Sequence, residues 1–310
     1  MQKQTRKYDI TQCALYKMKS LKNLKKILCI TEDECRNILS VIGYHSFKID
    51  KKDGIEKRTI TAPNNRIKKI QSRMLKLLQN VKRPEWLISG EKGKCYIDNG
   101  RVHLNSKYFL TMDIKKFYDN CRREYVFLFF RNQLCMAGDL AGLCTDIVTY
   151  NGGIPTGCPT SQIMAYYAYE NMFYEIFEIA YRYNCKFTIY VDDMTFSSKE
   201  PFDKRSLINE VDRTLRKYGH KPKYKKVKYY SNGESVPITG TVVEKRHELK
   251  VPNRLQKQVY DEFQEIKNLK GIKLTDEENK KLNSLKGRIQ ASRNIEEDKF
   301  PEIRRLTNLI

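Results

Sequence analysis

Two short apolar runs of this chain end in aspartate, and this pattern constrains the fold more than any other feature. The first run, a strand predicted over 107–113, ends in Asp113, and the second, predicted over 186–191, leads into Asp192 and Asp193. A buried carboxylate is costly without a counter-ion, and oxygen-only ligands suit Mg²⁺. A lone Asp-Asp pair is usually an ordinary hairpin turn. Two strands that both end in Asp instead favour two Mg²⁺ ions on shared carboxylates, as in phosphoryl transfer.

The charge balance of the chain points to a polyanionic partner. The formal net charge is +22 over 310 residues, while 40% of the residues are hydrophobic, which is enough for a folded core. Nucleic acid is the obvious partner. A basic membrane-surface protein would need an amphipathic basic helix or a lipidation motif, and the sequence has neither a Met-Gly start nor a terminal Cys box.

The sequence also bears on the compartment. It has no run of eighteen apolar residues and no secretory signal, so we expect a cytoplasmic protein without a membrane partner. Its nine cysteines include no C-x-x-C pair, which disfavours a zinc site and favours free thiols in a reducing cytosol.

Periodicity predicts an alternation of strands and helices. Residues 44–62 read as a hairpin around Asp53-Gly54, and Thr31 with Glu34 reads as a capping box. The lysines of residues 1–30 suit either RNA contact or a solvated helix face. Helices are predicted over 66–79, 122–150, 159–182 and 202–218, and the last sixty residues are predicted to be mainly helical.

Tyr190-x-Asp192-Asp193 between two apolar strand halves, with Asp113 ending another strand, resembles the palm of reverse transcriptases. The resemblance implies an α+β right-hand polymerase fold, with fingers, a palm whose antiparallel sheet is backed by helices, and a helical thumb. The implied regions are a basic helical segment over 1–43, fingers over 44–108, a palm over 109–245 with inserted fingers helices near 122–150, and a thumb over 246–310.

Further segments resemble motifs of the same family and imply a nucleotide site. Gly152 to Gln162 resembles the Leu-Pro-Gln-Gly-x-Pro-x-Ser motif, with Thr156 in place of Gln and with Gly157 allowing close backbone approach to nucleic acid. Lys57-Arg58 resembles the fingers motif that grips the triphosphate, although a solvated hairpin charge fits equally well. The implied nucleotide-binding residues are Lys57, Arg58, Ile114, Tyr118, Thr156 and Gly157; Tyr118 would exclude a 2′-hydroxyl, and Ile114 would join the three aspartates at the metals.

The Lys/Tyr-rich run 223–230 resembles the region that carries a family lysine able to protonate leaving pyrophosphate. Spacing to Gly240 favours Lys226 over Lys225 as that residue. The run also suits a basic strand that touches nucleic acid, so Lys223, Lys225 and Lys228 are candidate RNA contacts.

Two more segments resemble retron enzymes in particular. Asn99 and His103 match the retron Asn-Ala-x-x-His segment, with Gly100 in place of Ala, and Ile238-Thr239-Gly240 matches Val-Thr-Gly. The resemblance implies RNA contact by Asn99, His103, Thr239 and Gly240, although His103 could equally be structural.

A retron reverse transcriptase would copy part of its own structured non-coding RNA into a branched RNA–DNA hybrid (msDNA). The implied partners are that RNA, the msDNA product, deoxynucleotide triphosphates and a separate effector protein of an antiphage defence unit. Alternatives are a diversity-generating, phage-exclusion or group II intron type of reverse transcriptase, or a non-catalytic RNA-binding module with a palm-like fold.

Overall fold

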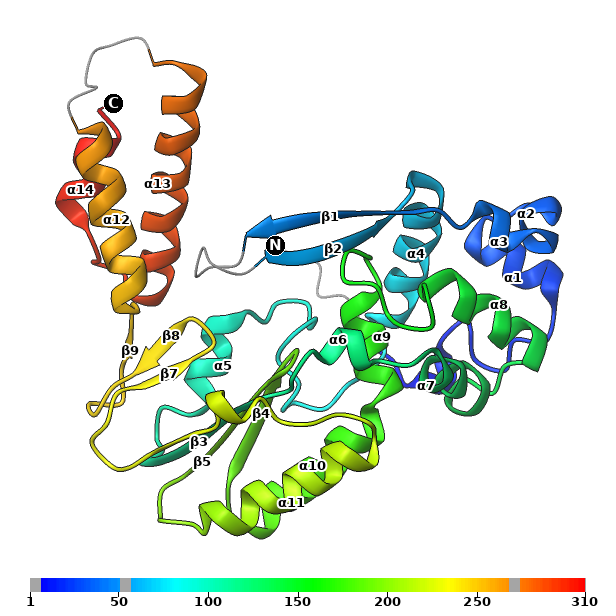
Figure 1. The fold of residues 1–310 in the computed structure, drawn as a ribbon, viewed down its shortest axis with the longest axis horizontal. Coiled ribbons are helices and arrows are strands. Elements are labelled where there is room, and N and C mark those ends of the chain that lie inside the picture. The colour runs from blue at the N-terminus through cyan, green and yellow to red at the C-terminus, as the bar shows by residue number, and fades with distance from the viewer. Residues whose placement is uncertain (1–6, 51–56, 268–273, 310) are drawn as a thin grey trace.

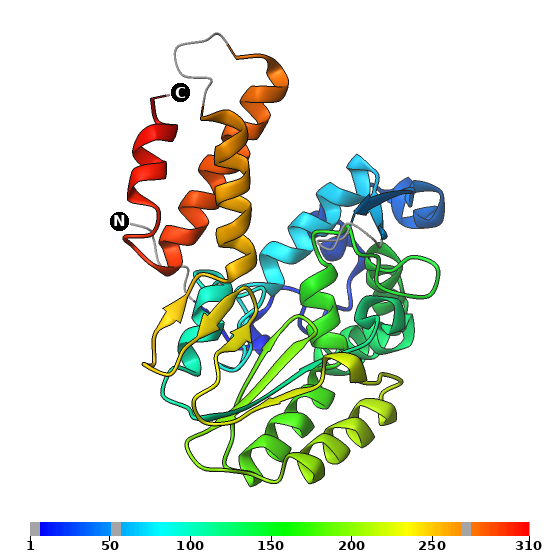
Figure 2. The same ribbon diagram turned by 60° about the vertical axis from the view of Figure 1, so that its left-hand side comes forward.

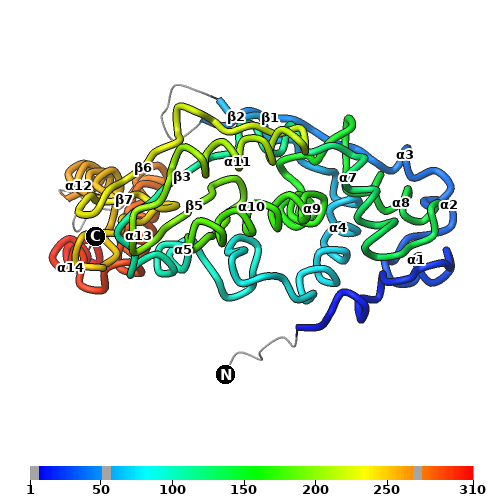
Figure 3. The backbone as a smooth tube through the Cα atoms, turned by 90° about the horizontal axis from the view of Figure 1, so that it is seen from below, coloured from blue at the N-terminus to red at the C-terminus, as the bar shows by residue number. Residues whose placement is uncertain are grey.

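The computed structural model describes residues 7–50, 57–267 and 274–309. The molecule is elongated, with the N-terminal helices at one end and the three C-terminal helices at the other (Figures 1 and 3). A four-stranded sheet lies between them. Within the described ranges, no helix is both long and apolar enough to cross a membrane.

The central sheet has the strand order β4-β5-β3-β6 and is antiparallel throughout. Its strands are β3 (Tyr108–Asp113), β4 (Lys186–Tyr190), β5 (Asp193–Ser198) and β6 (Lys228–Tyr230). Helices α10 (Glu170–Arg182) and α11 (Lys204–Lys217) lie together along one side of this sheet (Figure 2). Their apolar stripes explain the packing, because Ile176, Leu207 and Val211 are completely buried.

The predicted hairpin is formed by β1 (Tyr44–Asp50) and β2 (Lys57–Pro63), which pair antiparallel along their whole length. The Asp53-Gly54 turn lies outside the described residues. Helix α4 (Asn65–Leu78) follows, and the side chain of Asn64 caps it by accepting a hydrogen bond from the Ile67 N–H at 2.9 Å.

The N-terminal segment forms short helices that pack on α4. They are a 3₁₀ turn η1 (Ile10–Gln12), α1 (Leu21–Leu28), α2 (Glu32–Arg36) and α3 (Ile38–Val41). The capping box of Thr31 and Glu34 is confirmed. Of the three leucines on α1, Leu24 and Leu28 are fully buried, whereas Leu21 is exposed.

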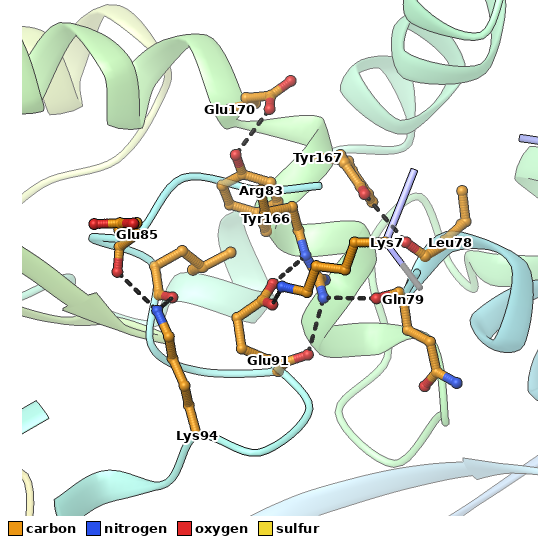
Figure 4. A network of polar contacts seen from close by, with 12 residues as sticks. Lys7, Leu78, Gln79, Arg83, Glu85, Glu91, Lys94, Tyr166, Tyr167 and Glu170 are labelled. Atoms are coloured by element: carbon orange, nitrogen blue, oxygen red, sulfur yellow. Dashed lines mark hydrogen bonds and ion pairs between the residues drawn. The ribbon is translucent and has the colours of Figure 1, made fainter. Parts of the chain in front are cut away.

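A buried ion pair ties the chain's beginning to the body (Figure 4). The Glu91 carboxylate, 5% exposed, pairs with Arg83 and Lys7. Arg83 Nη2 also donates to the carbonyls of Gln79 (3.3 Å) and Gly90 (3.1 Å). A buried carboxylate needs such partners, so this network fixes the segment around Glu91, which precedes β3 of the central sheet.

Two predicted long helices are interrupted. Residues 122–150 form α7 (Arg123–Leu128), a π-helical turn η2 (Phe129–Gln133) and α8 (Gly138–Val148), preceded by the short α6 (Phe117–Asn120). Residues 159–182 divide into α9 (Ser161–Ala168) and α10. The second break lies at Tyr169, whose buried hydroxyl accepts a hydrogen bond from the Arg122 N–H at 2.9 Å.

The C-terminal third begins with a 3₁₀ turn η3 (Tyr224–Lys226) and a small sheet of β7 (Val236–Ile238), β8 (Thr241–Val243) and β9 (Leu249–Lys250), beside α5 (Tyr96–Val102). Helices α12 (Asn253–Ile266), α13 (Asp276–Ile295) and α14 (Pro301–Thr307) follow and share a separate apolar core, which includes Val259, Leu285 and Ile289. This bundle stands apart from the sheet in Figure 1.

Candidate active site

The three predicted aspartates meet at one end of the central sheet. Asp113 at the end of β3 lies directly opposite Asp193 at the start of β5. Asp192 occupies the turn between β4 and β5, and its carbonyl accepts a hydrogen bond from the Ile114 N–H at 2.9 Å. Asp113 is only 8% exposed. The register of β3 against β5 thus brings together carboxylates that are about eighty residues apart in sequence.

The turn that carries Asp192 is strained and held from outside. Val191 has φ +62°, a conformation that a β-branched residue rarely adopts. Its N–H donates to the Ser89 hydroxyl at 2.8 Å, and Ser89 is 5% exposed. The flanking segment also pairs with β4, because the Ile88 N–H donates to the Ile189 carbonyl at 3.1 Å. Sequence reasoning missed Ser89, since no motif signals a residue that acts on a turn a hundred positions later.

The positive charges near the three aspartates do not fully compensate their negative charge. Burial and the neighbouring Asp113 raise the pKa of Asp192 to about 6, and burial with Asp192 and Asp113 raises that of Asp193 to about 7. Lys226 forms an ion pair with Asp113. Burial alone would lower the Lys226 pKa, but the hydrogen bond to Asp113 and the charges of the other two aspartates outweigh it and raise that pKa.

The raised pKa of Asp193, caused first by burial and then by the neighbouring carboxylates, predicts a pH-dependent stability. The pKa of Asp193 lies near 7 in the folded chain and near 4 when unfolded, so the folded state binds more protons between these values. Stability therefore falls as pH rises from about 4 to about 7. We expect Asp193→Asn to be more stable than the wild type at pH 8, by on the order of 2 kcal/mol, with little difference at pH 4. Urea unfolding without divalent cations measures this, and equal shifts at both pH values would contradict it.

These residues fit a divalent metal by their chemistry. Asp113, Asp192 and Asp193 offer only oxygen ligands, and the raised pKa values of Asp192 and Asp193 mark negative charge that a cation would neutralise. Within the part of the chain that the structure describes, no group of three Asp, Glu, His or Cys side chains is already arranged to hold a metal ion. At this site the Lys226 ammonium group is the counter-ion of the Asp113 carboxylate. The Ile114 side chain is fully buried in the core, which leaves only its main chain for any metal or nucleotide contact.

Two predicted nucleotide-binding side chains also approach this end of the sheet. Arg58 lies exposed near the start of β2, and its positive charge opposes the rise in pKa at both Asp192 and Tyr118. Tyr118 on α6 is half-buried; burial raises its pKa, and the charge of Asp192 adds to that effect. Lys57, opposite Asp50 in the hairpin register, is exposed. The structure therefore brings Arg58 and Tyr118 toward the carboxylates.

Thr156 and Gly157 join the hairpin to the sheet region. The Thr156 hydroxyl donates to the Thr59 carbonyl (3.3 Å), and the Gly157 N–H donates to the Thr61 carbonyl (2.9 Å). A Cβ on Gly157 would lie 2.6 Å from that Thr61 oxygen. The close approach that Gly157 permits here is to β2 of the chain itself, and its close approach to nucleic acid stays a prediction.

Asn99 and His103 do not occupy positions from which they could touch RNA, so the prediction of direct contact is wrong for their side chains. Both are completely buried on or beside α5. The His103 ring lies between the hydroxyls of Ser197 (2.6 Å) and Thr188 (2.7 Å), and burial lowers its pKa to about 3. His103 is therefore a neutral residue that fastens α5 to the central sheet.

Asn99 fastens the other side of α5. Its Nδ2 donates to the Thr239 hydroxyl at 2.8 Å. Thr239 (φ +41°) and Gly240 (φ +86°) form the two-residue loop between β7 and β8, the turn in which glycine is favoured. A Cβ on Gly100 would lie 2.5 Å from the Thr241 hydroxyl, so alanine does not fit there. The two retron-like motifs are thus one interlocked unit; the Gly240 end of the loop is exposed.

The lysines of the run 223–230 diverge. Lys226 reaches Asp113, whereas Lys225 and Lys228 are exposed and Lys223 donates its N–H to the Asp113 carbonyl at 2.7 Å. The predicted strand is a 3₁₀ turn up to Lys226 and a strand only from Lys228.

Comparison with solved structures shows the fold. A Candida albicans telomerase, solved in complex with a fragment of telomeric RNA, superposes with a TM-score of 0.52 at 12% identity, over 89% of this chain and 56% of that one. A Candida tropicalis telomerase gives a TM-score of 0.51 at 14% identity, over 78% of this chain and 51% of that one. The predicted right-hand polymerase fold is confirmed.

Curated relatives with retron names match part of the chain. The Retron Se72 reverse transcriptase of Salmonella heidelberg is 25% identical over 57% of this chain and 48% of its own length. The Escherichia coli enzymes of retrons Ec86 and Ec48 are 26% and 24% identical, over 59% and 73% of this chain and 58% and 59% of theirs. The chain thus spans about half to three fifths of the length of these relatives, and the predicted resemblance to retron enzymes is confirmed.

A family model described as "Reverse transcriptase (RNA-dependent DNA polymerase)" matches residues 49–251, which is more than half of the chain. That range contains the three aspartates, Arg58, Tyr118 and Lys226. The chain belongs to the reverse transcriptase family.

Proposed function

We propose that this protein is an RNA-directed DNA polymerase that adds deoxynucleotides to a primer along an RNA template. The observation that carries the proposal is the meeting of Asp113, Asp192 and Asp193 at one sheet end, with raised pKa values at the last two. A site built for another purpose would have no reason to keep such charge together. Family membership agrees with it.

Each side chain has a role in this proposal. The three carboxylates and the Ile114 main chain would hold two Mg²⁺ ions, which would activate the attacking 3′-hydroxyl and stabilise the negative charge of the leaving pyrophosphate. Lys226 would donate a proton to the leaving pyrophosphate. Arg58, with Lys57 beside it, would bind the triphosphate by its guanidinium fork, and Tyr118 would lie beneath the sugar.

The division into regions belongs to the same proposal. We assign the hairpin β1–β2 with α4 to the fingers, the central sheet with α9, α10 and α11 to the palm, and α12 to α14 to the thumb. Lys225 and Lys228 on the exposed side of the run 223–230, together with the Thr239–Gly240 loop, would face the RNA.

The retron resemblance suggests the template. We propose that the enzyme copies part of a structured non-coding RNA into msDNA, in the cytoplasm and with a separate effector protein in an antiphage defence unit. The retron names of the relatives support this proposal. A diversity-generating, phage-exclusion or group II intron type of enzyme is the main alternative.

Two measurements test the proposal. Purified protein should extend a DNA primer on an RNA template with Mg²⁺ and deoxynucleotides. Failure to extend the primer would favour the alternative of a non-catalytic RNA-binding module. Sequencing the nucleic acid that co-purifies separates the types of enzyme, because a retron enzyme should carry one RNA joined to DNA. Unrelated RNA without attached DNA would contradict the retron assignment.

A further inference from the structure

The charge of this chain is concentrated far from the C-terminal helices. Residues 1–82 contain twenty Lys and Arg against seven Asp and Glu, a net +13 of the total +22, whereas 252–310 contain thirteen against ten. Helices α1 to α4 of this region lie toward the end of the molecule opposite α12–α14, whereas the β1–β2 hairpin extends back toward those C-terminal helices (Figures 1 and 3). A polyanion held only between the sheet and the thumb would leave most of this charge unused.

A groove of about 570 Å³ lies between the end of α1 and one face of α4. Five of its lining residues on α4 are basic: Arg66, Lys68, Lys69, Arg73 and Lys76. Arg66, Lys69, Arg73 and Lys76 recur at three- and four-residue spacing and so share one helix face, with Lys68 beside Lys69, while Ile67, Met74 and Leu78 occupy the buried face.

The two arginines build the groove. Arg66 pairs with Glu34 and donates to the Cys29 carbonyl at 2.7 Å, and Arg73 Nε donates to the Ile27 carbonyl at 2.8 Å. Both therefore satisfy carbonyls at the C-terminal end of α1, where the helix dipole is negative. They fix α1 against α4 and cancel the negative charge on that wall.

The three lysines remain available. Lys68, Lys69 and Lys76 are exposed, and their ammonium groups make no hydrogen bond or ion pair with any part of the chain that the structure describes. The row spans eight residues, about 12 Å along the helix, which is longer than a single phosphate group. An extended strand of phosphates matches such a row better than a small anion does.

We propose that the α1–α4 groove binds the phosphate backbone of RNA outside the segment that is being copied. The inference rests on the proposed polymerase function, because that function supplies the RNA. The groove would anchor a structured RNA at the fingers end of the molecule while the aspartates act on another part of it. Recognition would be of backbone charge and shape rather than of bases.

The test compares two substrates with one triple variant. The first substrate is a short RNA template annealed to a DNA primer, and the second is the same duplex whose template continues into an RNA stem-loop. Lys68→Gln, Lys69→Gln and Lys76→Gln together should weaken binding of the second roughly tenfold at physiological salt. The slope of log affinity against log salt should flatten by about two. Extension of the short duplex should be unchanged.

A matched control removes the same charge elsewhere. Lys199→Gln, Arg205→Gln and Arg213→Gln alter three exposed cations on or beside α11 and should leave both substrates unaffected. If the α4 triple behaves like this control, the groove is not an RNA site. If the wild type fails to extend even the short duplex, it is the proposed polymerase function that fails, so the two outcomes are distinct.

Discussion

Asp113→Asn is expected to lower primer extension by at least about a thousandfold, a loss of roughly 4 kcal/mol of transition-state stabilisation. Asp113 lies opposite Asp193 in the pairing of β3 with β5, and it forms an ion pair with Lys226. It therefore adjoins both a second proposed metal ligand and the proposed proton donor. Asparagine preserves the shape but removes the charge that a metal and the lysine both need. Affinity for the RNA–DNA duplex should change by less than about threefold, because that affinity comes mostly from phosphate contacts.

Single-turnover extension together with duplex binding measures both quantities. Asp119→Asn is the matched control, since Asp119 is an exposed carboxylate on the same short helix as Tyr118. It should retain nearly full activity. If Asp113→Asn kept more than about a tenth of wild-type extension, with unfolding unaltered, the carboxylates would not be the metal ligands of the reaction.

The parts of the fold that the sequence predicted are those set by local pattern. The strands that end in Asp113 and precede Asp192 alternate or are continuously apolar, and the helix over 202–218 has a clear apolar stripe, seen as α11. The capping box at Thr31 is likewise local. Each of these signals lies within the element that it predicts.

The sequence predictions fail where contacts between residues that are distant in sequence determine the structure. The predicted helix 159–182 is interrupted at Tyr169, whose hydroxyl accepts a hydrogen bond from the Arg122 N–H, forty-seven positions away in sequence. A histidine at position 103 is compatible in sequence with either RNA contact or packing against the sheet. In the folded chain its ring lies between the hydroxyls of Ser197 and Thr188, which identifies it as a packing residue. Burial of a polar side chain depends on partners supplied by other elements, which periodicity does not reveal.

The candidate site shows the same division. Its carboxylates could be predicted because strand ends carry a readable pattern, whereas the support beneath them could not. Ser89 holds the strained Val191 turn, and Asn99 ties α5 to the Thr239 loop. Such residues shape the site without belonging to a motif of charged groups, so they emerge only once the chain is folded.

Tyr118→Ala is expected to raise incorporation of ribonucleotides relative to deoxynucleotides by at least about tenfold, or roughly 1.4 kcal/mol of lost discrimination. Tyr118 is half-buried on α6, its ring centroid 5.7 Å from that of Phe117, and its pKa responds to both Asp192 and Arg58. It therefore lies near both a proposed metal ligand and the proposed triphosphate clamp, and we propose that the sugar of an incoming nucleotide passes beside it. A close-packed ring there leaves no room for a 2′-hydroxyl.

The variant pair Tyr118→Ala and Tyr118→Phe separates sterics from chemistry. Phenylalanine keeps the ring and loses only the hydroxyl, so selectivity should stay close to that of the wild type, whereas alanine removes the ring. Competing deoxy and ribo substrates on one RNA template give the ratio directly, and the overall rate of each variant reports damage to the site. Phe117, 3% exposed in the core, supports the ring from behind. An unchanged ratio in Tyr118→Ala would mean that another side chain excludes the hydroxyl and that Tyr118 serves only to pack α6 against the sheet.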